Sequence, residues 1–347
     1  MQKIIDKLYK EHTLSQNEYL ETVNSFSREN AEYAAELARR ATLPVYGNKI
    51  FIRGLIEVSN ICKNDCLYCG IRKSNKNAQR YRLTKEEILE CCKEGYTLGY
   101  RTFVMQGGED GYFTDERVCD IVKSIKALYP DVAITLSLGE RSYESYKALR
   151  EAGADRYLLR HETADSCHYQ RLHPKELTLE NRKKCLADLK SLGFQAGCGF
   201  MVGSPYQNAE NIAKDLKFIE EFSPEMCGIG PFIPHSDTPF KDEKAGSAEL
   251  TCYLLSIIRI MKPNILLPAT TALGSVEENG RLKGILSGAN VVMPNLSPYS
   301  VREKYSLYNN KLHTGAESAQ ALEELKEQVE SIGYKIVTER GDYKQNI

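Results

Sequence analysis

The sequence predicts an α/β fold, in the form of a (βα)8 TIM-type barrel preceded by an N-terminal helical extension. Eight short, apolar, strand-like runs alternate with eight stretches of helical spacing between residues 49 and 331. The polar motifs of the chain directly follow the ends of these runs, which is where a barrel carries its active site. A doubly wound open sheet is the alternative. It typically has fewer units and a phosphate-binding fingerprint, and this sequence has no such fingerprint.

The first part of the chain predicts helices followed by a buried strand. Residues 1–45 carry apolar residues at helical spacing and predict helices. The run 49–59 is short, β-branched and apolar, and predicts a buried strand. Thr84 and Glu87 form an S/T-x-x-E capping box, which marks the start of the first barrel helix.

The remaining elements repeat this alternation. Further strands are predicted at 101–106, 132–138, 155–161, 195–203, 225–232, 265–271 and 289–294. Further helices are predicted at 114–128, 142–152, 178–192, 208–222, 247–262, 275–287 and 315–331. We therefore expect three parts: an N-terminal helical extension (1–45), the barrel (46–312), and a C-terminal helix and tail that complete the barrel (313–347).

The composition excludes several classes of function. The chain has 347 residues, 42% of them hydrophobic and 27% charged, with a net charge of −1. Acidic and basic residues are mixed, so a nucleic-acid surface is not expected. No apolar run approaches the length of a membrane span, and the start is an amphipathic helix rather than a secretory signal. Eleven cysteines without a pairing pattern indicate a reducing compartment, and we expect a cytoplasmic protein.

Three cysteines, Cys62, Cys66 and Cys69, lie in the stretch SNICKNDCLYCG at a C-x3-C-x2-C spacing. A structural zinc site would normally supply a second pair of ligands, and none follows at the required spacing. A disulfide would need an oxidising compartment. Three thiolates on one loop favour an iron–sulfur cluster with one unfilled position. Zinc and unliganded thiols remain the alternatives.

Other motifs follow the predicted strands. Residues 106–110 read QGGED, and paired glycines allow a ligand to approach the backbone, although a simple turn is the alternative. Residues 160–163 read RHET, and such charged groups at a barrel mouth are costly unless they are paired or bound to a ligand. Arg182 is expected in the first turns of a helix, against the helix dipole. A nearby carboxylate ligand would explain it, and an exposed arginine is the alternative.

The remaining histidines and cysteines are not expected to form a site. His168, His173 and His235 match no zinc spacing and are interpreted as locally hydrogen-bonded. The other cysteines are interpreted as small apolar residues: Cys91, Cys92, Cys119, Cys167, Cys185, Cys198, Cys227 and Cys252.

The cysteine triplet, with the aromatic Tyr68 before its last member, resembles the radical S-adenosylmethionine (SAM) superfamily. The GGE motif at 107–109 is similar to the superfamily's second motif. The resemblance implies a [4Fe-4S] cluster held by the three cysteines and SAM bound through its amino and carboxylate groups to the fourth iron. It also implies one-electron cleavage of SAM to a 5′-deoxyadenosyl radical inside the barrel.

Within the superfamily, several stretches resemble the [FeFe]-hydrogenase maturase family HydE. These stretches are SNICKNDCLYCGIRKSNKNAQRYRLT (59–84), TLSLGE (135–140), AGADRYLLRHETA (152–164), GIGPFIPHSDTP (228–239) and PATTALG (268–274). The resemblance covers roughly residues 45–310. Biotin synthase and methylornithine synthase share the cluster and the barrel.

The resemblance implies roles for individual residues. Those implied to bind SAM are Tyr68, Gly107, Gly108, Glu109, Ser137, Glu162, Arg182, Met201 and Ile229. Those implied to bind a small organometallic substrate, an iron carbonyl–cyanide complex carrying cysteine, are Arg53, Arg160, His161, Thr270, Thr271, Met293 and Tyr305. Implied partners are an electron donor such as ferredoxin or flavodoxin and the other hydrogenase maturases. We expect a monomer.

One feature departs from some members of the family. The chain has no cysteine after Cys252, so a second cluster is not expected, and 311–326 is interpreted as a plain amphipathic helix. Two other functions remain open. One is a radical SAM enzyme that acts on an amino acid or a vitamin precursor. The other is a non-enzymatic carrier of iron–sulfur intermediates.

Overall fold

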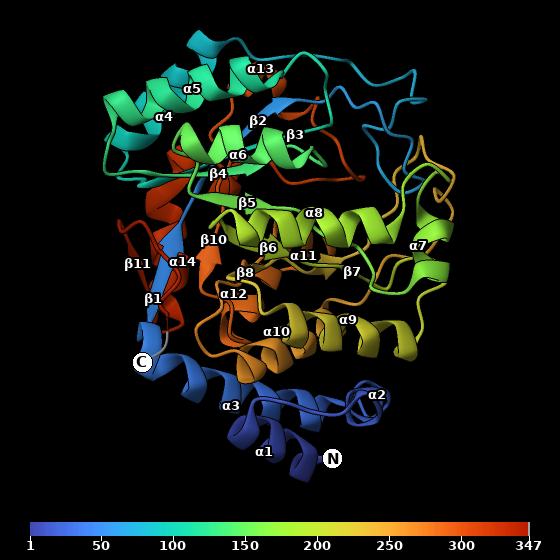
Figure 1. Ribbon diagram of the computed structural model, residues 1–347. Coiled ribbons are helices and arrows are strands. Elements are labelled where there is room, and N and C mark those ends of the chain that lie inside the picture. The colour runs from blue at the N-terminus through green and yellow to red at the C-terminus, as the bar shows by residue number, and fades with distance from the viewer. Residues whose placement is uncertain (346–347) are drawn as a thin grey trace.

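A closed ring of eight parallel strand segments forms the centre of the computed structural model, which describes residues 1–345 (Figure 1). Six strands pair in this order: β2 (Gly54–Ser59), β3 (Thr102–Gly107), β4 (Ala133–Ser137), β5 (Arg156–Leu158), β6 (Gln195–Cys198) and β8 (Met226–Cys227). Parallel bridges Met226↔Leu266 and Pro268↔Val291 continue the ring. β10 (Val291–Val292) then pairs with β1 (Lys49–Ile52), which leads directly into β2. The predicted α/β barrel is confirmed.

Helices surround the ring and connect its strands. These are α4 (Lys85–Thr97), α5 (Asp115–Leu128), α6 (Tyr143–Glu151), α8 (Leu179–Ser191), α9 (Ala209–Phe222), α10 (Ala248–Met261) and α12 (Gly280–Leu286). The capping box predicted for α4 forms. Thr84 Oγ1 accepts a hydrogen bond from the Glu87 amide at 3.2 Å, and Glu87 Oε2 accepts one from the Thr84 amide at 2.7 Å. Side-chain caps such as Thr114, Thr178 and Asn208 begin other barrel helices in the same way, by satisfying free amides of the first turn.

The N-terminal residues are helical, as predicted, and form α1 (Gln2–Glu11), α2 (Gln16–Asn24) and α3 (Arg28–Tyr46). They lie at the bottom of Figure 1, where α3 contacts α10. α10 is apolar on most of its surface and is buried from Tyr253 to Met261. A helix that is apolar all round needs cover on both sides, and here the barrel and α3 provide it.

Two predicted strands are broken rather than continuous. The run 195–203 divides into β6 and β7 (Met201–Val202), and the run 225–232 divides into β8 and β9 (Gly230–Pro231). The break lies where the two backbones meet, because a Cβ on Gly199 would be 2.0 Å from the Gly228 carbonyl oxygen. After the break, β7 and β9 pair with each other.

Three other predicted elements differ in extent from those in the structure. The run 265–271 makes only isolated bridges, and a short helix, α11 (Thr271–Val276), already begins at Thr271. One reason is that Pro268 has no amide to donate to a ladder. The predicted helix 275–287 divides into α11 and α12 at Asn279, which has a left-handed φ of 60°. The predicted strand 155–161 is reduced to β5.

The prediction of one amphipathic helix over 311–326 is wrong. Short 3-10 turns occupy Gly315–Glu317 and Ala319–Ala321, and the helix α14 covers only Leu322–Ser331. Tertiary contacts hold the preceding residues out of a helix. Lys311 forms an ion pair with Glu57, and Ser318 makes a bridge with Asn295. These partners lie far away in the sequence, so the local pattern could not reveal them.

The strand β11 (Lys335–Val337) lies at the end of the barrel opposite the cysteine loop, at the left of Figure 1. It pairs in parallel with β1, on the side of β1 that does not face β10. The chain after it reaches the barrel axis, where Asp342 binds the buried Arg156. The segment therefore closes the N-terminal end of the ring.

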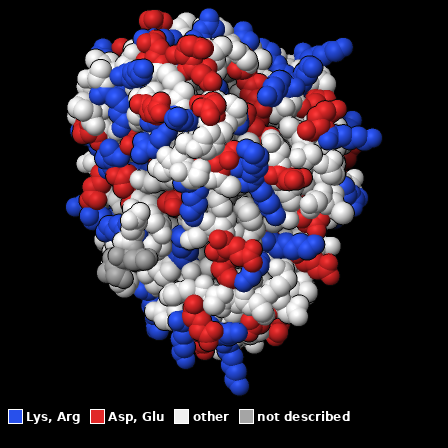
Figure 2. All heavy atoms as spheres, viewed as in Figure 1, with Lys and Arg blue, Asp and Glu red and all other residues white. Residues whose placement is uncertain are grey.

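The surface carries both signs of charge. Figure 2 shows Lys and Arg side chains interspersed with Asp and Glu over the face in view. In the part of the chain that the structure describes, no helix combines the length and the apolar character needed to cross a membrane.

Candidate active site

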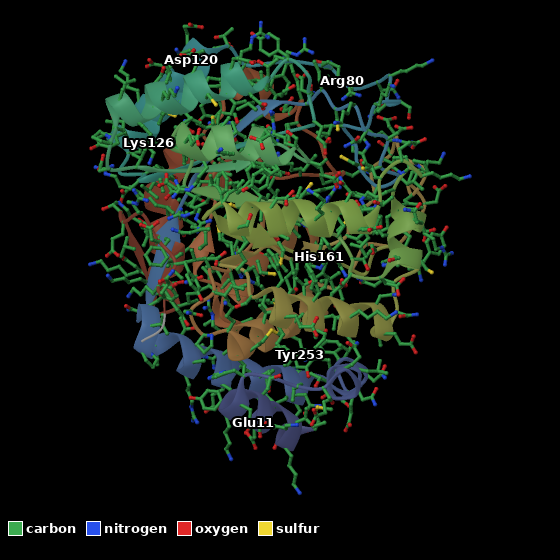
Figure 3. All side chains as sticks on the ribbon, viewed as in Figure 1. Glu11, Arg80, Asp120, Lys126, His161 and Tyr253 are labelled. Atoms are coloured by element: carbon green, nitrogen blue, oxygen red, sulfur yellow. The ribbon has the colours of Figure 1, made fainter. Side chains whose placement is uncertain are left out.

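The three cysteines of the triplet lie on the long loop between β2 and α4, at the right of Figure 1. The Cys69 amide donates to the Cys66 carbonyl at 3.4 Å, which turns the loop on itself. Arg80, labelled at the upper right of Figure 3, holds the loop through hydrogen bonds. Its guanidinium donates at 2.5–3.0 Å to the carbonyl oxygens of Asn60, Ile71, Arg72 and Asn75. The sequence analysis gave Arg80 no role, because an arginine in a polar loop carries no distinguishing pattern.

The environment of the triplet suits a metal cluster. Burial raises the pKa of the Cys69 thiol to about 12, and burial together with the neighbouring thiols raises the pKa of Cys66 well above its ordinary value. Such thiols stay protonated until a metal binds and displaces the proton. Cys62 Sγ also accepts a hydrogen bond from the Glu109 amide at 3.4 Å. Three partly buried cysteines with a backbone donor fit the donor set of an iron–sulfur cluster.

The triplet is not gathered around a single ion. Within residues 1–345, no three His, Cys, Asp or Glu side chains form a group that could hold one metal ion. A cluster with several irons needs thiolates that are spread around it, each bound to a different iron. The sequence spacing left zinc as an alternative. Among residues 1–345, the three thiols of this loop are not arranged as ligands of one zinc ion.

The GGE motif after β3 lies directly against the cysteine loop. A Cβ on Gly108 would be 2.3 Å from the Ile61 carbonyl oxygen and 2.8 Å from Cys62 Cβ. Only glycine allows this approach. The side chain of Glu109 turns toward the loop after β4, where Oε1 accepts from the Glu140 amide at 3.0 Å and Oε2 lies 3.1 Å from Lys63 Nζ.

Glu162 and Arg182 meet at the same end of the barrel. Glu162 has a left-handed φ of 64°, and its Oε2 lies 3.0 Å from Arg160 Nη2 without the geometry of a hydrogen bond. Arg182 Nε donates to Glu140 Oε1 at 2.6 Å, and its Nη1 donates to the Arg160 carbonyl. The carboxylate that the sequence analysis expected from a ligand is thus present in the protein as Glu140.

The other residues implied to bind SAM surround this group less tightly. The Tyr68 hydroxyl lies 3.2 Å from His173 Nε2, and Met201 packs in the same apolar cluster as Tyr68. Ser137 ends β4 next to Gln106 in β3. Ile229 is fully buried between β8 and β9.

The interior of the barrel holds buried polar atoms without partners. Within residues 1–345, no hydrogen bond reaches Nε and Nη2 of Arg53, Nε of Arg160, or the hydroxyls of Thr135 and Thr270. Arg53 Nη1 donates to the sulfur of Met226 at 3.1 Å. Burial, reinforced by Arg156, lowers the pKa of Arg53 well below its ordinary value. These unsatisfied donors fit an anionic or acceptor-rich ligand, because burying them without one is costly.

Two further residues implied to bind substrate lie near this interior. The Tyr305 hydroxyl is 3.4 Å from Gln106 Nε2, and Met293 packs against Met226 and Leu266. Thr135 was missed by the sequence analysis. It lies two residues before Ser137 in the same strand and therefore on the same face, which is the signal that could have found it.

Two of the implied substrate residues do not face the interior. His161 is fully buried behind β5, with its Nε2 3.3 Å from Asp215 and its ring 4.7 Å from Phe218, both on α9. His161 follows the end of β5, and its side chain packs toward α9, whereas Glu162 lies next to Arg160. Thr271 donates to Glu317 Oε2 at 2.8 Å instead of to the interior. In this structure these two side chains have protein partners, and their assignment to the substrate stays a prediction.

The remaining histidines are held locally, as predicted. His168 Nδ1 lies 3.0 Å from Thr163 Oγ1, and His173 Nδ1 lies 3.0 Å from the Tyr169 carbonyl. His235 Nε2 lies 3.2 Å from Ser306 Oγ. Among the cysteines interpreted as apolar, Cys167 differs, because it is exposed on the short helix α7 (Ser166–Leu172).

Comparison with known proteins agrees with this geometry. The family model described as the radical SAM superfamily matches residues 56–219. The [FeFe] hydrogenase maturase subunit HydE of Thermotoga maritima is 47% identical over 266 residues, which cover 77% of this chain and 76% of that protein. The chain belongs to the HydE family of the radical SAM superfamily. Proteins of this superfamily use a [4Fe-4S] cluster and SAM, so the chain is a radical SAM enzyme.

More distant relatives share the fold. The 3-methylornithine synthase of Methanosarcina barkeri is 28% identical over 311 residues, covering 88% of this chain and 87% of that protein. A crystal structure of methylornithine synthase aligns with a TM-score of 0.83 at 25% identity, over 96% of this chain and 97% of that one. A structure of HydG, a maturase of the [FeFe]-hydrogenase, aligns with a TM-score of 0.82 at 20% identity, over 97% of this chain and 75% of that one, and supports the fold alone.

Proposed function

We propose that this enzyme acts in the maturation of [FeFe]-hydrogenase, on a small sulfur-containing iron carbonyl–cyanide substrate inside the barrel. The identity to the HydE relative supports the process. The unsatisfied donors of the interior, above all the guanidinium of Arg53, support the class of substrate. Carbonyl and cyanide ligands accept hydrogen bonds, and an anionic complex would offset the buried positive charge.

The cofactors would lie at the mouth of the barrel. We assign Cys62, Cys66 and Cys69 as the cluster ligands, and bound there the cluster would supply the electron for reductive cleavage of SAM. Gly108 keeps the cysteine loop seated against β3. Glu109 would accept from the ammonium of SAM in place of its present contact with Lys63.

Glu162, Ser137 and Arg182 would hold the ribose and the carboxylate of SAM. The Oε2 atom of Glu162 is buried without a hydrogen-bond donor, so it can accept from a ribose hydroxyl. Arg182 is fixed by Glu140, and this fixed geometry reduces the entropy lost on binding. The remaining part of the barrel excludes water from the reacting groups.

The proposal also covers the partners of the enzyme and its location in the cell. The single-electron chemistry requires a donor, and we propose a ferredoxin or flavodoxin. We also propose that the enzyme is a monomer that works with the other maturases. All eleven cysteines are free thiols, which suits the reducing cytoplasm.

Production of 5′-deoxyadenosine by anaerobic, dithionite-reduced enzyme tests the proposal. We expect turnover with a cysteine-bearing iron carbonyl–cyanide complex and none with lysine or dethiobiotin. Thr270→Val removes an unsatisfied hydroxyl at nearly constant shape and should raise the KM for this complex about tenfold, the effect of one lost hydrogen bond. Thr251→Val, whose hydroxyl donates to Ser247 within α10, is the matched control and should leave KM unchanged.

A second candidate is a reaction on an amino acid precursor. It is favoured by the alignment with methylornithine synthase over nearly the whole chain. Turnover with lysine, together with no response to the iron complex, would establish it in place of the first proposal.

A further inference from the structure

His161 is enclosed behind the active site. Its Nδ1 accepts a hydrogen bond from the Gly199 amide at 3.2 Å, so the ring proton is carried by Nε2. The Nε2 atom lies 3.3 Å from Asp215 Oδ1, without the geometry of a hydrogen bond. Both side chains are completely buried, and Figure 3 labels His161 between α8 and α9. Burial lowers the pKa of the imidazole well below its ordinary value.

Asp215 on α9 makes a second connection to the same loop. Its Oδ1 accepts a hydrogen bond from the Ala164 amide. The two side chains therefore hold the backbone on both sides of residue 162. His161 binds the neighbouring strand at Gly199, and Asp215 binds the chain two residues beyond Glu162.

Glu162 needs such support. Its φ of 64° is left-handed, a conformation that is unfavourable for a non-glycine residue. Its amide donates to the Gly199 carbonyl at 3.0 Å, and residue 162 forms a bridge with Phe200. Residue 162 thus binds Gly199, which also binds His161, and it lies two residues before Ala164, which binds Asp215. The strained backbone turns the carboxylate inward, next to Arg160.

We propose that His161 and Asp215 are positioning residues, which hold Glu162 in its left-handed conformation and thereby set the affinity of the enzyme for SAM. Neither side chain reaches the mouth of the barrel, so they act only through Glu162. The proposal rests on the assignment of Glu162 to SAM in the proposed function. It gives a chemical role to a buried His–Asp pair that an apolar pair could replace if packing were the only requirement.

A double-mutant cycle on the cluster-loaded enzyme tests this proposal, with SAM affinity measured by equilibrium dialysis. Asp215→Ala should weaken SAM binding about tenfold, which corresponds to about 1.4 kcal/mol. In a Glu162→Ala background the same change should have almost no further effect, because the carboxylate that it positions is absent. Asp215→Asn keeps an oxygen that accepts from Ala164 and should recover most of the affinity.

Two controls separate positioning from a general loss of stability. Ser256→Ala removes a buried hydroxyl on α10 that bonds the Ser287 carbonyl, far from Glu162, and should lower stability without changing SAM affinity. If Asp215→Ala does not fold, His161→Gln is used in the same cycle. Wild-type affinity in a folded Asp215→Ala variant, or an equal loss in the Glu162→Ala background, would overturn the proposal. Failure of the wild-type enzyme to bind SAM would instead refute the proposed function.

Discussion

Arg156 on β5 and Asp342 in the C-terminal tail form an ion pair at the closed end of the barrel, with Nη2 and Oδ1 2.7 Å apart. Arg156 is fully buried and also donates to the carbonyls of Arg340 and Gly341. The tail therefore neutralises a charge that the barrel could not leave unpaired.

This ion pair predicts a stability that falls in acid. Burial raises the pKa of Asp342, but Arg156 and Arg340 lower it further, to about 2. The carboxylate thus stabilises the fold above the unfolded pKa of about 3.9, and this contribution is lost as the pH falls toward about 2. Because the side chain of Asp342 is 40% exposed, water screens the ion pair. We therefore expect the pair to stabilise the fold by about 1 kcal/mol, less than the full pKa shift would imply. Asp342→Asn should remove this amount near neutral pH and nothing near pH 2.

Urea unfolding of the metal-free protein at several pH values measures the difference in the free energy of unfolding between wild type and Asp342→Asn. Asp131→Asn alters a surface pair with Arg101 and serves as the control, with little change expected. A difference between wild type and Asp342→Asn that stays constant with pH would contradict the assignment.

Gly108→Ala should disturb the cysteine loop. The added Cβ would overlap the Ile61 carbonyl oxygen, so the loop must move, at a cost of about 1–3 kcal/mol. We expect a lower iron and sulfide content after reconstitution. Gly111→Ala is the matched control, because its Cβ would meet nothing within 4 Å. Equal iron content in the two variants would show that the close approach is unimportant.

Cys66→Ser should abolish cluster binding and the cleavage of SAM. Serine is a far weaker iron ligand than thiolate, and the loop offers no replacement. Cys185→Ser, on α8, should keep both properties, since its thiol contacts only neighbouring groups such as the Arg141 carbonyl. Iron analysis and the electron paramagnetic resonance signal of the reduced protein, with and without SAM, measure the outcome. Equal loss in both variants would contradict the ligand assignment.

Lys311→Met should destabilise the protein by about 3 kcal/mol, because it leaves the buried carboxylate of Glu57 without its cation. Asn295, which donates to Glu57 at 2.8 Å, cannot replace that charge. Lys326→Met breaks an exposed pair with Glu323 and should cost about 0.5 kcal/mol or less. Chemical unfolding of both variants measures this contrast, and similar losses would refute it.

Much of the active site could be predicted from local patterns. The spacing of the cysteine triplet and the glycines at 107–108 are short-range features whose chemistry needs those residue types at those positions. The barrel followed from the alternation of strand-like and helical runs, and the Thr84 cap from four consecutive residues. Each depends on interactions between near neighbours in the chain, which a sequence displays directly.

Other features depended on partners that are distant in the sequence. His161 reads as one more polar group in RHET, and only the pairing of β5 with β6 and the position of α9 turn it toward Asp215. Residues 311–321 carry a helical pattern, yet Glu57 and Asn295 hold them out of a helix.

The sequence by itself determined the barrel and the family, and it supplied the proposed cluster ligands, because these follow from periodicity and fixed spacing. The tertiary structure alone decided which polar side chains face the interior and which support them from behind. It also decided how the tail closes the ring through Arg156 and Asp342. The physical reason is that a buried charge or an unsatisfied donor can be recognised only when every group packed around it is known.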